Sequence, residues 1–174
     1  MKLNRELAEM AKKNGICEDW YKELRTTEDI GKLLKMYLNG IDFCLSNEYP
    51  PLPFIRKHFV GTMEAFGIFL DEKITARNSK YVVALGSCTG EAEYTDFAVG
   101  EVFVKHSSKL TIKASGNAFV MVDVFDETEV EVIASGNAKV CVNQYGGNLT
   151  TTTEDETGSG KSVIKVIHKQ TKTY

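Results

Sequence analysis

The sequence predicts an α+β protein in which an N-terminal helical cap precedes a parallel β-solenoid with coils of about 20 residues. Three observations predict this fold. Apolar residues recur at helical spacing up to about residue 60, and the spacing changes to two from about residue 67. Two successive segments of 20 residues also match without a gap. We expect the cap to span 1–62 and the solenoid 63–174.

The helical cap is expected to contain three to five short helices. Leu3, Leu7 and Ala11 follow i, i+4, i+8 spacing, which predicts a first helix that stops near Gly15. A second helix is expected over 18–24. Thr26 or Thr27 is the expected N-cap of a third helix, because a hydroxyl oxygen can accept a bond from an amide of the first turn. The third helix and two later ones are expected over 28–38, 41–45 and 51–59.

The C-terminal part consists of short apolar runs in which β-branched residues alternate with polar ones. Gly, Asn, Asp and Ser separate these runs. This pattern is typical of strands with one buried face. The runs lie at Phe69, Val82–Val83, Val102–Val104, Leu110–Ile112, Val120–Val124, Val130–Val132, Val140–Val142 and Val163–Ile167.

The internal repeat decides between solenoid and other β folds. Residues 110–129 and 130–149 share seven identities, and the corner Ser115, Gly116, Asn117, Ala118 recurs as Ser135, Gly136, Asn137, Ala138. Coils stacked about 4.8 Å apart place equivalent residues on one another, so we expect Val120 on Val140 and Val122 on Val142. The preceding block, 90–109, keeps Ala98, Val102 and Val104 in phase but lacks the SGNA corner.

The corner residues have expected structural roles. Gly116 can adopt a positive φ at the bend, and Asn117 over Asn137 could form a side-chain amide ladder. Ala114 and Ala118 suit a tight interior beside the corner. An antiparallel hairpin sandwich with similar turns is the alternative fold.

The open ends of a solenoid expose unpaired strand edges, which favour aggregation unless they are protected. We expect the helical cap to cover the first coil. Oligomerisation is the other solution, and the outward residues Phe119, Met121 and Cys141 would form an apolar strip for it or lie under the helices. Lys161, Lys165, His168, Lys169 and Lys172 supply charge at the C-terminal end.

Composition and residue spacing exclude several classes of protein. The net charge of −3 gives no basic field for nucleic acid. The first residues lack the apolar core of a secretory signal, and no apolar run is long enough to span a membrane. The cysteines Cys17, Cys44, Cys88 and Cys141 form no zinc or disulfide pattern, so we expect a cytoplasmic protein without metal or cofactor.

The sequence gives only weak evidence for catalytic groups. His58 could activate Cys44 as a nucleophile, but a core thiol and a helix-end histidine explain both residues. Acid pairs such as Glu91/Glu93, Asp123/Asp126 and 154–156 could bind cations or cleave glycosides, although solvated corners explain them better. The segment 158–162 echoes a phosphate loop but lacks its first glycine.

The segment 40–50, GIDFCLSNEYP, and the segment 54–59, FIRKHF, resemble a family of uncharacterised proteins from gut bacteria and their phages. That resemblance covers most of the chain and implies a helical N-terminus before a repetitive β region, without assigned catalytic residues. The β half is also similar in pattern to bactofilins and to adhesin head domains. Similarity at this level implies fold and leaves function open.

We therefore expect a non-enzymatic protein that acts by binding or assembly, as a homo-oligomer or with a protein partner, in a phage-associated or host-interaction role. A membrane is not an expected partner, because no apolar run is long enough to span it. Nucleic acid is not expected either, because the cations Lys32, Lys35, Arg56 and Lys57 are few and interspersed with acids. The alternative is a small-molecule, nucleotide or carbohydrate-active solenoid. The expected partner-binding residues are Trp20, Tyr49, Phe54, Arg56 and His58.

Overall fold

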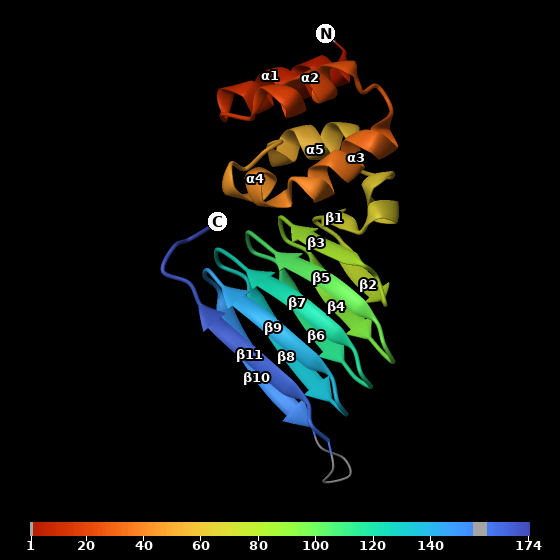
Figure 1. Ribbon diagram of the computed structural model, residues 1–174, viewed down its shortest axis with the longest axis vertical. Coiled ribbons are helices and arrows are strands. Elements are labelled where there is room, and N and C mark those ends of the chain that lie inside the picture. Colours follow the sequence, from red (N-terminus) through yellow and green to blue (C-terminus); the bar gives the residue numbers. More distant parts are fainter. Residues whose placement is uncertain (1, 155–159) are drawn as a thin grey trace. The chain divides into compact units, whose positions relative to one another are not determined.

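The computed structural model describes residues 2–154 and 160–174 of the 174-residue chain. The chain forms two compact units, which are described separately (Figure 1). The helical unit comprises Met1–Phe66 with Thr173–Tyr174, and the solenoid unit comprises Gly67–Lys172. The helical unit extends to Phe66 because a 3-10 turn follows its last α-helix.

The helical unit contains five α-helices among its described residues, at the upper end of the predicted three to five. Helices α1 and α2 pack against each other, and Leu7 and Ala11 of α1 and Leu24 of α2 are buried. Pro51 precedes α5, where a fixed φ and a missing N–H are compatible with a helix start. The elements are α1 (Leu3–Lys13), α2 (Glu18–Thr26), α3 (Ile30–Asn39), α4 (Ile41–Ser46), α5 (Leu52–His58) and η1 (Met63–Phe66).

The N-cap of α3 differs from the prediction. Asp29 caps the helix, and its carboxylate accepts the backbone N–H of Lys32 at 2.7 Å. The hydroxyls of Thr26 and Thr27 instead donate to the carbonyl of Glu23 at 3.1 and 2.8 Å. Both threonines therefore end α2, because their hydroxyls satisfy carbonyls of the preceding turn.

The solenoid unit consists of two parallel sheets, and the chain alternates between them. Sheet A has the order β1-β3-β5-β7-β9-β11, and sheet B has the order β2-β4-β6-β8-β10. Each coil therefore contributes one strand to each sheet. The strands are β1 (Ile68–Leu70), β2 (Lys73–Arg77), β3 (Tyr81–Leu85), β4 (Thr89–Tyr94), β5 (Val99–Val104), β6 (Lys109–Ala114), β7 (Phe119–Val124), β8 (Glu129–Ser135), β9 (Lys139–Gln144), β10 (Asn148–Glu154) and β11 (Val163–His168).

The strand register confirms the predicted stacking. Val122 pairs with Val102 of the coil before it and with Val142 of the coil after it, and its side chain is 0% exposed. Val120 likewise pairs with Val140. Every strand pair among the described residues is parallel, so the alternative of an antiparallel hairpin sandwich is wrong.

The coils have different lengths at the two ends of the solenoid. In the first coil Ile68 pairs with Val83, fifteen positions later, whereas the central coils keep the spacing of 20. At the last coil Val140 pairs with Ile164, twenty-four positions later. A fixed 20-residue window therefore loses the repeat at both ends although the stacking continues.

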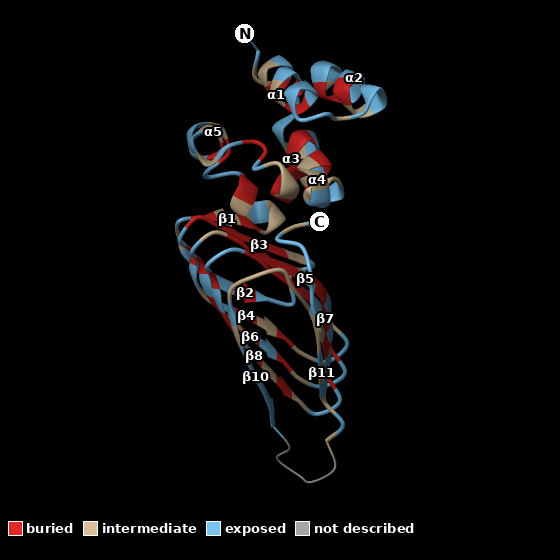
Figure 2. Ribbon diagram, turned by 90° about the vertical axis from the view of Figure 1, so that its left-hand side faces the viewer, coloured by how far each residue is buried: buried red, intermediate tan, exposed pale blue. Residues whose placement is uncertain are grey.

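Burial alternates along the strands, and the inward residues form one core between the two sheets (Figure 2). Small residues make room for large ones in neighbouring coils. A Cβ atom at Gly100 would lie only 2.2 Å from the ring of Tyr94, which is the largest fully buried side chain among the described residues. Gly100 therefore provides the space that the Tyr94 ring occupies.

Candidate interaction surfaces

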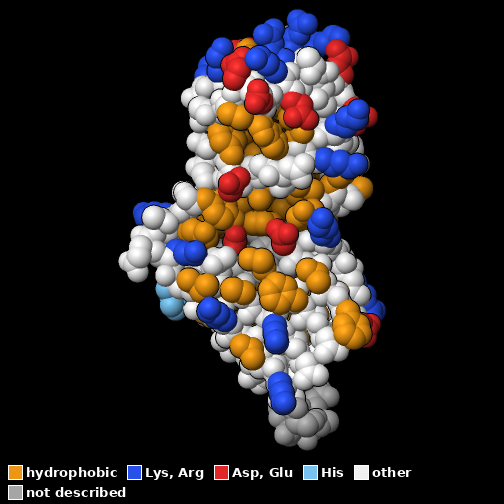
Figure 3. Space-filling model, viewed as in Figure 1, with side chains coloured by type: hydrophobic (Ala, Val, Ile, Leu, Met, Phe, Trp, Pro, Cys, Tyr) orange, Lys and Arg blue, Asp and Glu red, His pale blue; other side chains and the backbone are white. Residues whose placement is uncertain are grey.

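The outer face of sheet A carries exposed apolar side chains. Phe119 and Met121 on β7 are each 42% exposed, Val99 on β5 is 62% exposed, and Phe97 in the preceding corner is 80% exposed. Figure 3 shows hydrophobic side chains interspersed with cations on this side of the solenoid. The predicted outward position of Phe119, Met121 and Cys141 is thus confirmed, and Cys141 is half-buried.

Register places these apolar side chains in adjacent columns on sheet A. Val99 pairs with Phe119, which pairs with Lys139, and Met121 pairs with Cys141, which pairs with Lys165. Each column thus contains a lysine nearer the C-terminal end. The first column continues from Lys139 to the exposed Val163, and in the second Glu101 precedes Met121. We call Phe97, Val99, Phe119, Met121 and Cys141 the apolar face.

The outer face of sheet B has a different composition. Its side chains are mainly Lys, Glu and Thr, and several form cross-strand ion pairs. Lys109 contacts Glu129 and Lys113 contacts Glu91, each at 2.9 Å. The hydrogen bond that Lys113 donates to Glu91, together with the negative charge of Glu91, raises the pKa of Lys113. This face therefore resembles an ordinary solvated surface.

One series of corners connects sheet B to sheet A and contains the SGNA repeat. Gly116 and Gly136 have φ values of 65° and 62°, as predicted. Asp96 occupies the equivalent position with φ 56°. The segment Thr95–Ala98 is therefore a third copy of this corner, although its sequence differs from SGNA. Asn117 and Asn137, both described, form no side-chain hydrogen bond with each other. The Asn137 N–H instead donates to the Gly116 carbonyl at 2.8 Å.

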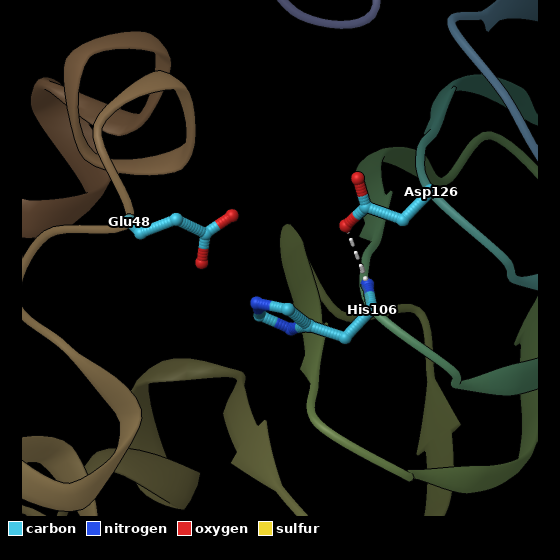
Figure 4. Close-up of side chains that lie close together, drawn as sticks. All are labelled: Glu48, His106 and Asp126. Atoms are coloured by element: carbon cyan, nitrogen blue, oxygen red, sulfur yellow. Dashed lines mark hydrogen bonds between the residues drawn. The ribbon is translucent and has the colours of Figure 1, made fainter.

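The opposite corners, from sheet A to sheet B, are held by side chains that accept backbone N–H groups. His106 and Asp126 both have a positive φ, and Asp126 accepts the N–H of His106 at 2.9 Å (Figure 4). His106 Nδ1 in turn accepts the N–H of Gly86 at 3.0 Å. Lys105 Nζ lies 3.1 Å from the Asp126 carboxylate. Asp126 therefore has a structural role in this corner.

An aromatic stack lies beside these corners. The rings of Phe125 and Tyr145 are nearly parallel, with centroids 4.8 Å apart. Lys105 Nζ lies 5.5 Å from the Phe125 ring and Lys169 Nζ lies 5.7 Å from the Tyr145 ring. Two cations therefore flank one aromatic pair, an arrangement that stabilises successive coils. The sequence signal is the 20-residue offset between positions 105, 125 and 145.

The expected partner-binding residues lie in three parts of the helical unit. Tyr49 is buried, and its hydroxyl donates to the Leu7 carbonyl at 3.0 Å. Trp20 is half-buried, and its ring lies beside Gly40. The rings of Phe54 and His58 contact each other, with centroids 4.5 Å apart, whereas Arg56 is exposed. A binding role for these residues stays a prediction.

The candidate catalytic groups have ordinary structural environments. Burial, with a smaller effect of the Asp42 carboxylate, raises the pKa of the Cys44 thiol, which makes it a poor nucleophile. Glu93 lies 3.9 Å from Arg77, so both carboxylates of the Glu91/Glu93 pair have a cationic neighbour. In the candidate phosphate loop 158–162 and the acidic run 154–156, positions 155–159 lie outside the described residues.

Among the described residues, no helix combines the length and apolar composition that crossing a membrane requires. No protein-family model, curated protein or solved structure matched the chain.

Proposed function

We propose that this chain is a non-enzymatic binding and assembly protein, and that the apolar face of sheet A is the surface that contacts a protein partner. The observation that carries the proposal is the contrast between the two sheets. They share one interior, but only sheet A, among the described strands, has several large apolar side chains exposed on its outer face. Contiguous apolar surface of this kind is a common mark of an interaction site.

The charge around the apolar face indicates the chemistry of the partner. Lys139 and Lys165 follow Phe119 and Cys141 in the same two columns of the sheet, so the cations lie towards the C-terminal end and Glu101 lies on the other side of Met121. An apolar segment that also carries Asp or Glu would bury its apolar side chains against Phe119 and Met121 and place its carboxylates near the two lysines. The rings and thioether supply contact area, and the lysines favour one orientation.

A phage-associated accessory or host-interaction role, as the resemblance implies, belongs to this proposal, together with the cytoplasmic location expected from the dispersed cysteines. The alternative of a nucleotide or carbohydrate ligand would require convergent cations or unpaired carboxylates. The carboxylates of sheet B described above have cationic neighbours. This pairing argues against the alternative ligands and therefore favours protein binding. A thermal-shift panel of nucleotides and glycans separates the two functions, and we expect no shift.

The test is selection of a random peptide library against the immobilised full chain. We expect the selected peptides to combine apolar residues with Asp or Glu. The double variant Phe119→Ser, Met121→Ser should bind them at least tenfold more weakly. The matched control on sheet B, Thr111→Ser with Glu131→Gln, should bind them like the wild type. Equal binding by the Phe119/Met121 variant would show that the apolar face is not the binding surface.

A further inference from the structure

The last coil differs from every earlier coil of the solenoid in that no further described coil covers it. Strands β10 and β11 are the last strands of sheets B and A (Figure 1). Ile164 and Val166 pair with Val140 and Val142, and Leu149 pairs with Val130. The three residues of the preceding coil are buried, whereas Leu149, Ile164 and Val166 are only half-buried. The core therefore continues to this end and is open there.

Backbone geometry shows which polar groups remain at this edge. Val163 and Lys169 donate their N–H groups to the carbonyls of Ala138 and Gln144, at 3.0 and 2.8 Å. Backbone groups alternate in direction along a strand, so the odd-numbered residues of β11 face β9. The N–H and C=O groups of Ile164, Val166 and His168 consequently face the open edge.

The same reasoning applies to β10. Asn148 donates its N–H to the Thr128 carbonyl at 2.8 Å, so the even-numbered residues of this strand face β8. The N–H and C=O groups of Leu149, Thr151 and Thr153 face the open edge. Six residues on two strands thus present edge-facing backbone groups, and their side chains are those on the core side of the coil.

We propose that this C-terminal edge pairs with the same edge of a second copy of the chain, in a closed twofold dimer. A second copy supplies two edge strands at the spacing of the two sheets, together with apolar residues in the same layer. A twofold rotation about an axis perpendicular to the sheets places β11 antiparallel to β11 of the second copy. It also places β10 antiparallel to β10 of the second copy. The contact buries the open core and satisfies the edge-facing backbone groups at the same time.

Charge constrains the register of the β11 pair. If Lys165 lay on the axis, two ammonium groups would face each other directly, which destabilises a cross-strand pair. With Val166 on the axis, Lys165 lies opposite Ile167 of the second copy. Strand β10, with its four threonines at 150–153, meets its own equivalent in sheet B, where β-branched residues and Thr–Thr contacts are favourable.

The proposal deepens the assembly part of the proposed function, but it uses residues outside the apolar face. The test is sedimentation velocity and light scattering of the full chain over a hundredfold concentration range. We expect a dimer of twice the 19.4 kDa chain mass. The variant Val166→Pro removes an edge-facing N–H and leaves the Lys165 and Ile167 N–H groups to β9, and an edge strand tolerates proline. We expect it to self-associate at least tenfold more weakly.

A second variant, Val166→Lys, places a charge on the core side of the edge and should weaken the dimer to a similar extent. Circular dichroism should show that both variants stay folded, and Met121→Lys on the apolar face should leave the dimer intact. A monomeric wild type, assemblies that keep growing with concentration, or variants that dimerise like the wild type would each overturn the proposal. Peptide binding by a monomeric Val166 variant would show that the apolar face works independently of the dimer.

Discussion

The inner and outer sides of the solenoid strands differ in how far they repeat. On the inner side, valines stack on valines through successive coils, as at positions 102, 122 and 142. On the outer side, the same strands carry apolar residues on sheet A and charged residues with threonine on sheet B. An inner residue contacts its own equivalents, so a change in one coil disturbs its neighbours. Outer residues are free of this constraint, and we therefore look for function there.

The largest expected effect comes from placing a charge on the inner side. Val122→Asp buries a carboxylate between Val102 and Val142, and we expect a loss of more than about 4 kcal/mol in the free energy of unfolding. The neighbouring outward variant Met121→Asp should change it by less than about 0.5 kcal/mol. Urea unfolding followed by circular dichroism measures both values. Similar losses for the two variants would contradict the assignment of inner and outer sides.

Glycine substitutions give a smaller effect and distinguish strand from corner. A Cβ atom at Gly90 would lie 2.0 Å from the backbone oxygen of Ile74, at φ 131°. We expect Gly90→Ala to cost about 2–3 kcal/mol, because backbone must move. Gly136→Asn should cost less than about 1 kcal/mol, since Asp96 already has the same conformation in an equivalent corner. Thermal unfolding of both variants tests the order, and a larger loss for Gly136→Asn would contradict it.

The smallest effect concerns two buried tyrosine hydroxyls. The Tyr94 hydroxyl has no hydrogen-bond partner among the described residues, whereas the Tyr49 hydroxyl donates to Leu7. We expect Tyr94→Phe to leave stability at neutral pH unchanged or raise it by up to about 1 kcal/mol, because an unsatisfied polar group is removed. Tyr49→Phe is the matched control and should cost about 0.5–1.5 kcal/mol. A loss for Tyr94→Phe as large as that for Tyr49→Phe would show that the Tyr94 hydroxyl has a partner.

The wild type and the variant Tyr94→Phe can also be compared as a function of pH. Burial raises the pKa of Tyr94 above its ordinary value of 10.0. The folded state therefore holds this proton more strongly than the unfolded state, and the resulting stability is fully present below pH 10. It is lost as the pH rises above 10. We expect the unfolding free energy of the wild type to fall faster above pH 10 than that of Tyr94→Phe, and parallel curves would contradict this.

Much of the fold was predictable because the repeat has a direct physical cause. Stacked coils require the same small or β-branched residue at each inner position, so Val120, Val122, Ala114 and Ala118 recur in the sequence. Helical spacing of apolar residues predicted the first three helices, and the break at 39–40 and the prolines at 50–53 indicated where the two later ones begin. The cap at Asp29 was missed because Thr, Asp and Asn all suit an N-cap, and the choice depends on where the preceding helix ends.

The interaction surfaces were only partly predictable. Alternation along β7 predicted that Phe119 and Met121 point outward, but the columns that join them to Val99 and Lys139 depend on the register. The corner at Asp96 was hidden because Asp, like Gly, can adopt a positive φ. The open edge at β11 was obscured because its coil is longer, so Ile164 and Val166 lie out of phase with the 20-residue repeat.

The stacking of the coils in solution can be measured directly with spin labels on the outer face of sheet B. Thr75, Glu91, Thr111, Glu131 and Thr150 form one column of register partners. In a chain with Cys17 and Cys141 replaced by serine, label pairs at 75/131 and 75/150 span three and four strand spacings of about 4.8 Å. Electron paramagnetic resonance should give separations of about 14 and about 19 Å. Separations that do not increase by one strand spacing from the first pair to the second would contradict the stacked solenoid.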